Sequence, residues 1–173
     1  LAKKPVLISD VQPELRLKMV DNAMKDFGFY GTTSRYEIIP HKRNPKKARI
    51  SYWVDLPQPF HYGNVQLWGW NPPMDSIVRS YMRFSELKPG RQYDVNVLNQ
   101  ERQRMSDRLR NHGYYFFQPD YIEFLVDTTQ GGKMADVRIG LKQGIPQNAF
   151  HPYKIGEVKV MLSGNETTGG QDT

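Results

Sequence analysis

One stretch of this sequence repeats, with substitutions, 85 residues further along the chain: Met19–Tyr30 is matched position by position by Arg104–Tyr115. A second echo pairs Phe60–Gly63 with Phe150–Gly156, so the period is roughly 85 to 93 residues. A period of this kind is typical of a chain that uses one structural unit more than once. Chemistry seldom needs two copies of a whole domain, whereas a binding arm does, so the repeat favours a modular binding protein.

The length of 173 residues suits two small units of this size. A unit of roughly 90 residues is large enough to bury a modest core. Apolar runs extend over only a few residues, so the sequence offers no transmembrane helix. The absence of cysteine excludes disulfides, thiolate metal sites and cysteine nucleophiles.

The second unit is the more complete of the two and can be interpreted element by element. Alternating apolar residues predict strands over 62–68, 121–127 and 134–141. Two helices are expected between the first and second strands, over 74–84 and 94–111, because capping residues precede them and Gly113 follows the second. The order is β-α-α-β-β, which predicts an α+β unit with a small three-stranded sheet and two helices on one face.

The first unit repeats only the last three of these elements. We expect a helix from about Val11 to Phe27, with Gly28 as its stop, and strands near Tyr36–Ile39 and Ala48–Val54. The first strand and first helix have no counterpart, so the first unit is expected to be incomplete.

These elements predict three segments: a first unit over 1–59, a second unit over 60–150, and a third segment over 151–173. In the third segment, Tyr153–Leu162 is expected to be the opening strand of a further unit, followed by a polar, disordered tail. The chain is therefore expected to be an excerpt from a longer series. Leu56–Pro59 is short and rich in proline, which favours a narrow range of angles between the first two units.

The net charge of +6 is concentrated in one loop. Residues 1–60 contain 11 Lys and Arg against 6 Asp and Glu, whereas residues 61–173 contain 13 against 12. This loop would suit a contact with nucleic acid or with lipid headgroups, and a nucleic-acid-binding module is the alternative function that the pattern supports. A charged hairpin tip that is simply solvated explains the same cluster of cations. We therefore expect no nucleic-acid partner. The cations concerned are Lys42, Arg43, Lys46, Lys47 and Arg49.

No motif of catalysis or of cofactor binding is present. The four histidines lack metal-ligand spacing, and neither a G-x-S-x-G elbow nor a glycine-rich phosphate loop occurs. An enzyme is therefore not expected, and neither is a cofactor or a metal ion.

Several motifs in their order resemble the POTRA domains of the BamA/TamA family of outer-membrane β-barrel assembly proteins. They are the Pro-Gly-x-x-Tyr-Asp segment at Pro89–Asp94, the helix end at Leu109–Tyr115, and the aromatic-x-Ile-Gly-x-Val segment at Tyr153–Val158. The resemblance extends from about residue 5 to residue 162. The basic stretch Glu101–Arg110 looks most similar to that of lipoprotein-type TamA relatives.

The resemblance implies a periplasmic arm on the outer membrane of a Gram-negative bacterium. Such an arm would bind unfolded outer-membrane protein clients and envelope partner proteins, and would deliver them to a membrane β-barrel beyond residue 173. The implied mechanism is β-augmentation at the second strand of the domain. If the Glu123 amide faces outward, proline at this position is expected to abolish edge pairing. In the first unit this strand maps to 36–39. In the second unit, Ile122, Phe124 and Val126 are expected on its buried face. The full set of expected binding residues is Tyr121, Ile122, Glu123, Phe124, Leu125, Val126 and Asp127.

Overall fold

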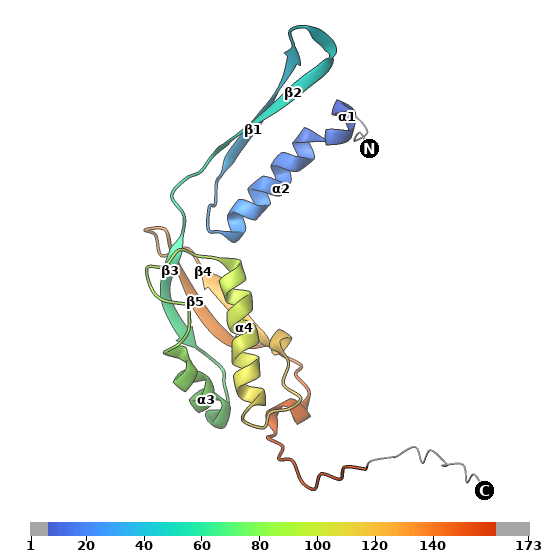
Figure 1. The fold of residues 1–173 in the computed structure, drawn as a ribbon. Coiled ribbons are helices and arrows are strands. Elements are labelled where there is room, and N and C mark those ends of the chain that lie inside the picture. Colours follow the sequence, from blue (N-terminus) through green and yellow to red (C-terminus); the bar gives the residue numbers. More distant parts are fainter. Residues whose placement is uncertain (1–6, 162–173) are drawn as a thin grey trace, which may run out of the picture.

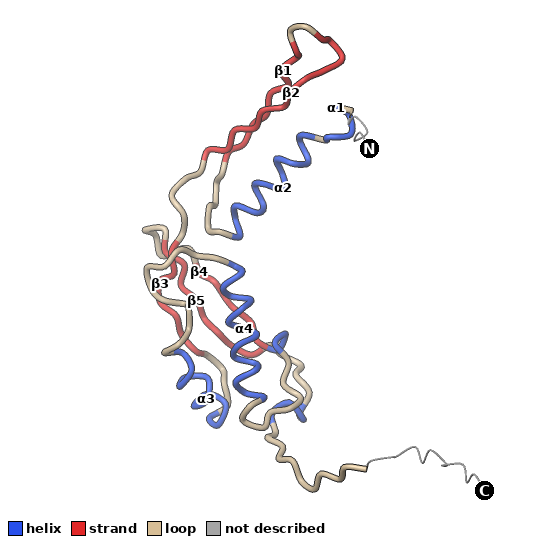
Figure 2. The backbone as a smooth tube through the Cα atoms, viewed as in Figure 1, coloured by secondary structure: helices blue, strands red, loops and turns tan. Residues whose placement is uncertain are grey.

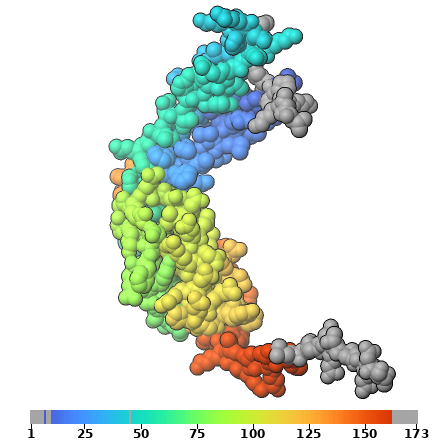
Figure 3. All heavy atoms as spheres, in the orientation of Figure 1, coloured from blue at the N-terminus to red at the C-terminus, as the bar shows by residue number. Residues whose placement is uncertain are grey.

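The structure is a computed structural model that describes residues 7–161. It is an elongated, curved molecule, with a long β-hairpin at one end and residues 152–161 at the other (Figures 1 and 3). The elements form two separate sheets, one of two strands and one of three. The expectation of an α+β fold with tandem small sheets is confirmed.

The second unit contains all five predicted elements in the predicted order. They are β3 (His61–Leu67), α3 (Pro72–Met82), α4 (Val95–Arg110), β4 (Ile122–Asp127) and β5 (Met134–Leu141). Short 3-10 helices occur at Pro119–Tyr121 (η1) and Gln147–Phe150 (η2). The strand order is β3-β5-β4, so the last strand in the chain is the central one. It pairs in parallel with β3 and antiparallel with β4.

Local hydrogen bonds explain where the two helices of this unit begin and end. The Asn71 side chain accepts a hydrogen bond from the Met74 amide at 3.1 Å, and the Asp94 side chain accepts one from the Asn96 amide at 2.7 Å. Both are side-chain caps of the kind that satisfies a free amide at a helix start. After α4, Gly113 adopts a φ of 95°, which favours glycine and stops the helix.

The hydrophobic core lies entirely in the second unit. Every buried apolar side chain among residues 7–161 falls between Tyr62 and Ala149. Within β5, Ala135, Val137 and Ile139 are fully buried while Arg138 is exposed, so one face of the sheet packs against the core. Figure 2 shows α3 and α4 beside this three-stranded sheet.

The first unit consists of α1 (Ile8–Val11), α2 (Pro13–Asp26), β1 (Thr33–His41) and β2 (Asn44–Asp55). The single helix expected over residues 11–27 is instead broken at Gln12, which has a left-handed φ of 45°. The cause is Pro13, because a residue before proline is disfavoured in the right-handed helical region. β1 and β2 pair as an antiparallel hairpin, and α2 contains no buried residue.

The strand expected at Tyr153–Leu162 does not form within residues 153–161, and Leu162 lies outside the described residues, as does the tail expected over 163–173. Ile155 and Val158, on the apolar face of this predicted strand, are 88% and 71% exposed. The physical reason is that a strand needs a neighbour to accept its backbone hydrogen bonds, and no strand of residues 7–161 pairs with this segment.

Candidate protein-binding edge of the second sheet

β4 is the outermost strand of the three-stranded sheet, because only β5 lies beside it. Six of the seven residues expected at the binding site belong to β4, and Tyr121 closes the 3-10 helix η1 just before it. An outermost strand presents a row of backbone groups that can pair with another chain. The strand predicted from the sequence over 121–127 therefore lies at an edge of the sheet.

The hydrogen-bond register identifies which amides face outward. The Lys142 amide donates to the Tyr121 carbonyl at 2.9 Å, which makes these two residues a hydrogen-bonded pair of the antiparallel ladder. Such pairs alternate, so the backbone groups of Glu123 also face β5, whose Gly140 lies opposite. The backbone groups of Phe124 and Val126 consequently face outward. The Glu123 amide therefore faces β5, so a proline at this position would break the ladder with β5 and would not test edge pairing.

Side-chain burial decreases along β4. Ile122 is fully buried, and the ring of Phe124 is half-buried beneath the Arg102 guanidinium, which lies 5.2 Å from the ring centroid. Leu125 and Val126 are 44% and 37% exposed. Val126 was expected on the buried face and is not buried; it lies in the outermost strand, which has a neighbouring strand on one side alone. The second half of β4 thus offers apolar side chains as well as free backbone groups.

A carboxylate closes the far end of the strand. Oδ1 of Asp127 accepts hydrogen bonds from the Thr129 amide at 2.9 Å and from the Thr129 hydroxyl at 2.7 Å. These bonds, and one from Gln130, hold the pKa of Asp127 below its ordinary value. The turn into β5 is therefore anchored from within, and the free edge ends at Asp127.

The opposite edge of the sheet is partly covered by the chain itself. Along β3, the Tyr62 amide donates to the Arg91 carbonyl at 2.7 Å, and the Gly90 amide donates to the Tyr62 carbonyl at 2.8 Å. The Tyr93 amide donates to the Phe60 carbonyl at 2.8 Å. Residues 90–93, called here the covering segment, therefore form hydrogen bonds along the outer edge of β3 at its start. Of the two edges, β4 is the open one.

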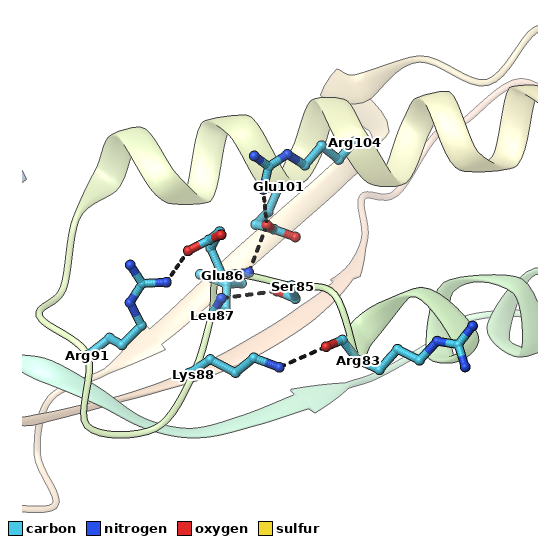
Figure 4. Close-up of polar contacts among 8 residues, drawn as sticks. All are labelled: Arg83, Ser85, Glu86, Leu87, Lys88, Arg91, Glu101 and Arg104. Carbon is cyan, nitrogen blue, oxygen red and sulfur yellow. Dashed lines mark hydrogen bonds and ion pairs between the residues drawn. The ribbon is translucent and has the colours of Figure 1, made fainter.

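A buried glutamate holds the chain that leads into the covering segment (Figure 4). Glu101 is fully buried in α4, and its Oε1 accepts hydrogen bonds from the Glu86 amide at 3.0 Å and from Arg104 at 2.9 Å. Further contacts fix the same loop: Glu86 pairs with Arg91, and the Lys88 ammonium donates to the Arg83 carbonyl at 3.0 Å. Sequence reasoning missed Glu101. Its signal was an acidic residue three positions from Leu98 and four from Met105, on the inward stripe of the helix.

The edge expected in the first unit, 36–39, lies within β1. It runs beside α2, where the Tyr36 hydroxyl donates to Oε1 of Glu14 at 3.4 Å. The two-stranded sheet gives β1 and β2 one neighbouring strand each. The second unit is thus the one that combines an open edge with a rigid core behind it.

Within residues 7–161, no group of histidines and carboxylates is arranged to hold a metal ion. In the same part of the chain, none of the helices has both the length and the apolar character required to cross a bilayer.

Comparison with known proteins matches the second unit to a domain family. The family model described as "POTRA: Surface antigen variable number repeat" matches residues 61–144. No curated protein matches the chain.

Solved structures similar to this chain include parts of two BamA proteins and of one Omp85 protein. POTRA domains 3–5 of BamA from Haemophilus influenzae match at 19% identity and a TM-score of 0.39, over 75% of this chain and 48% of that one. BamA of Haemophilus ducreyi lacking POTRA domains 1–3 matches at 15% identity and a TM-score of 0.42, over 82% of this chain and 24% of that one. The N-terminal domain of Omp85 from Thermosynechococcus elongatus matches at 16% identity and a TM-score of 0.37, over 72% of this chain and 48% of that one. The chain spans at most about half the length of these structures.

Proposed function

We propose that this chain, whose residues 61–144 form a POTRA domain, is the periplasmic segment of an outer-membrane protein assembly factor. In this proposal it is a binding module and not an enzyme. It binds extended client chains or partner proteins and passes them to a membrane β-barrel of the same polypeptide. The binding site is the edge strand β4 with the residue before it, Tyr121–Asp127.

The observation that supports this site is the contrast between the two edges of one sheet. The start of β3 is occupied by residues 90–93, whereas β4 has outward backbone groups at Phe124 and Val126 and no second neighbour. A guest strand that pairs with these groups gains main-chain hydrogen bonds, which every sequence except proline can supply. An assembly factor needs this tolerance, because its clients differ in sequence.

We further propose that the chain divides into units at 1–59, 60–150 and 151–173. The support is that the same kind of contact, between the glycine that follows a unit's long helix and the start of the next unit, occurs twice. The Gly28 carbonyl accepts a hydrogen bond from the Phe60 amide at 2.9 Å, and the Gly113 carbonyl accepts one from the Tyr153 amide at 2.7 Å. Phe60 and Tyr153 each also meet an aromatic ring edge-on, at centroid distances of 5.4 and 5.2 Å. Tyr153 thus has the position, relative to the second unit, that Phe60 has relative to the first.

The test is a substitution that removes one outward donor. In Val126→Pro the missing amide faces away from β5, so the internal ladder keeps its hydrogen bonds while a guest strand loses one. An extended peptide with alternating apolar residues is titrated into isotope-labelled protein, and the amide signals of residues 121–127 are followed. We expect affinity to fall at least about tenfold in Val126→Pro, since a lost pairing leaves a donor or acceptor unsatisfied.

The matched control is Val126→Ala, which trims the same side chain but keeps the amide. It should bind nearly as the unmodified chain does. Equal binding by Val126→Pro and Val126→Ala, or unmoved signals at residues 121–127 at saturating peptide, would exclude β4 as the site.

A further inference from the structure

The tip of the β1–β2 hairpin is a concentrated positive charge with no acidic residue in it. Its five cations lie within residues 41–49, called here the hairpin tip. None of the five side chains makes an ion pair or a side-chain hydrogen bond among the described residues. All five are exposed. They are Lys42, Arg43, Lys46, Lys47 and Arg49.

The geometry presents these charges together. β1 and β2 pair up to the turn at Lys42 and Arg43, with Pro40 opposite Ala48 and Ile39 opposite Arg49. Cations from the turn and from β2 therefore surround a shallow hollow that also contains Ile39 and Pro40. The hairpin tip projects from the end of the molecule that is remote from the second unit (Figures 1 and 3). It can thus approach a flat surface without interference from α4 or β4.

We propose that the hairpin tip binds the anionic phosphate headgroups of a phospholipid membrane surface. Two features favour a membrane over nucleic acid. First, residues 41–49 contain no Phe, Tyr or Trp on which a base could stack. Second, the cations are spread around an open hollow with apolar side chains, which suits a surface of mobile headgroups above an apolar layer. The attraction is electrostatic, so it weakens with added salt.

The expected strength follows from the number of charges. A Lys or Arg near an anionic membrane contributes a factor of roughly five in binding. Replacing three of them should therefore weaken binding on the order of 100-fold.

The experiment compares two variants of equal net charge on the full chain. The test variant is Lys42→Gln/Arg43→Gln/Lys47→Gln. The control variant is Arg108→Gln/Lys142→Gln/Lys154→Gln, which removes three exposed cations of the second and third segments. Co-sedimentation is measured with vesicles of phosphatidylcholine alone and of phosphatidylcholine mixed with phosphatidylglycerol.

We expect the unmodified chain and the control variant to bind the mixed vesicles and the test variant to lose this binding. Equal loss in both variants, or equal binding to neutral vesicles, would overturn the proposal. A single-stranded oligonucleotide that binds more tightly than the vesicles and displaces them would overturn it in favour of nucleic acid. Peptide binding at β4 should be unchanged in the test variant, so the result is independent of the function proposed above.

Discussion

The two units share a helix followed by two antiparallel strands, yet only one of them has a core. In the second unit α4 contributes Leu98, Met105 and Leu109 to a buried cluster, whereas α2 contributes no buried residue. The described part of the first unit, residues 7–59, contains no counterpart of β3 and α3. β3 and α3 supply Tyr62, Met74 and Val78, which close the core from the other side. A helix on a hairpin is thus not sufficient to exclude water.

The apolar side chains of the first unit are covered less completely than those of the second unit. Leu15 and Met19 of α2 are 51% and 64% exposed, and Trp53 of β2 is 38% exposed. By the repeat offset of 85, Leu15 and Met19 correspond to Gln100 and Arg104, which are outward positions of α4. The counterparts of the buried Met105 and Leu109 are Val20 and Met24, which are only half-buried. The stability of the chain is therefore expected to reside almost entirely in the second unit.

The largest effect should come from truncating the core at equivalent positions of the two helices. Leu109 is fully buried, and Met24, which precedes it by the repeat offset of 85, is only half-buried. We expect Leu109→Ala to lower the free energy of unfolding by about 2–5 kcal/mol, because it leaves a cavity. Met24→Ala should cost less than about 1 kcal/mol. Urea unfolding followed by fluorescence measures both, and equal losses would refute the contrast between the units.

A smaller effect is expected at the buried glutamate. Glu101→Ala leaves the Glu86 amide without its acceptor, which should cost about 1–3 kcal/mol. The loosened loop should also release the covering segment from β3. Hydrogen exchange should then accelerate at the amides of Tyr62, Gly90 and Tyr93, with little change in β5.

The control for this prediction is Arg104→Gln, which keeps Glu101 in place and removes only its half-exposed partner. Exchange at Tyr62 should be faster in Glu101→Ala than in Arg104→Gln. If the two variants exchange alike, the covering segment does not depend on the glutamate.

Features determined by neighbours in the sequence were predictable. The caps at Asn71 and Asp94, the glycine stop at Gly113 and the limits of β5 all follow from side chains within a few residues of one another. The repeat added the order of elements, and the resemblance suggested that the strand at 121–127 lies at an edge.

Features determined by distant contacts were not predictable in this way. Alternation alone placed Val126 on the buried face, because alternation does not show how much of an outermost strand its neighbours cover. It also gave no indication that residues 90–93 would occupy β3, since those hydrogen bonds join segments about 30 residues apart. The strand expected at 153–161 has the right residues, but a strand also requires a partner that the sequence of the segment does not specify.

The smallest predicted effect is a pH dependence of the turn between β4 and β5, which a carboxylate holds. The hydrogen bonds from Thr129 favour the charged form of Asp127, so its folded pKa is lower than its unfolded one. Its contribution is therefore present above the unfolded pKa and disappears as the pH falls through the folded pKa. In the first hairpin the residue at the same place, the last of its first strand, is His41, whose Nδ1 accepts a hydrogen bond from the Arg43 amide at 3.2 Å, so no carboxylate holds that turn. Acidification should thus shift the Thr129 amide signal with a midpoint below the ordinary range for aspartate, while Asp127→Asn abolishes that titration. A Thr129 signal that titrates identically in Asp127→Asn would show that another group controls the turn.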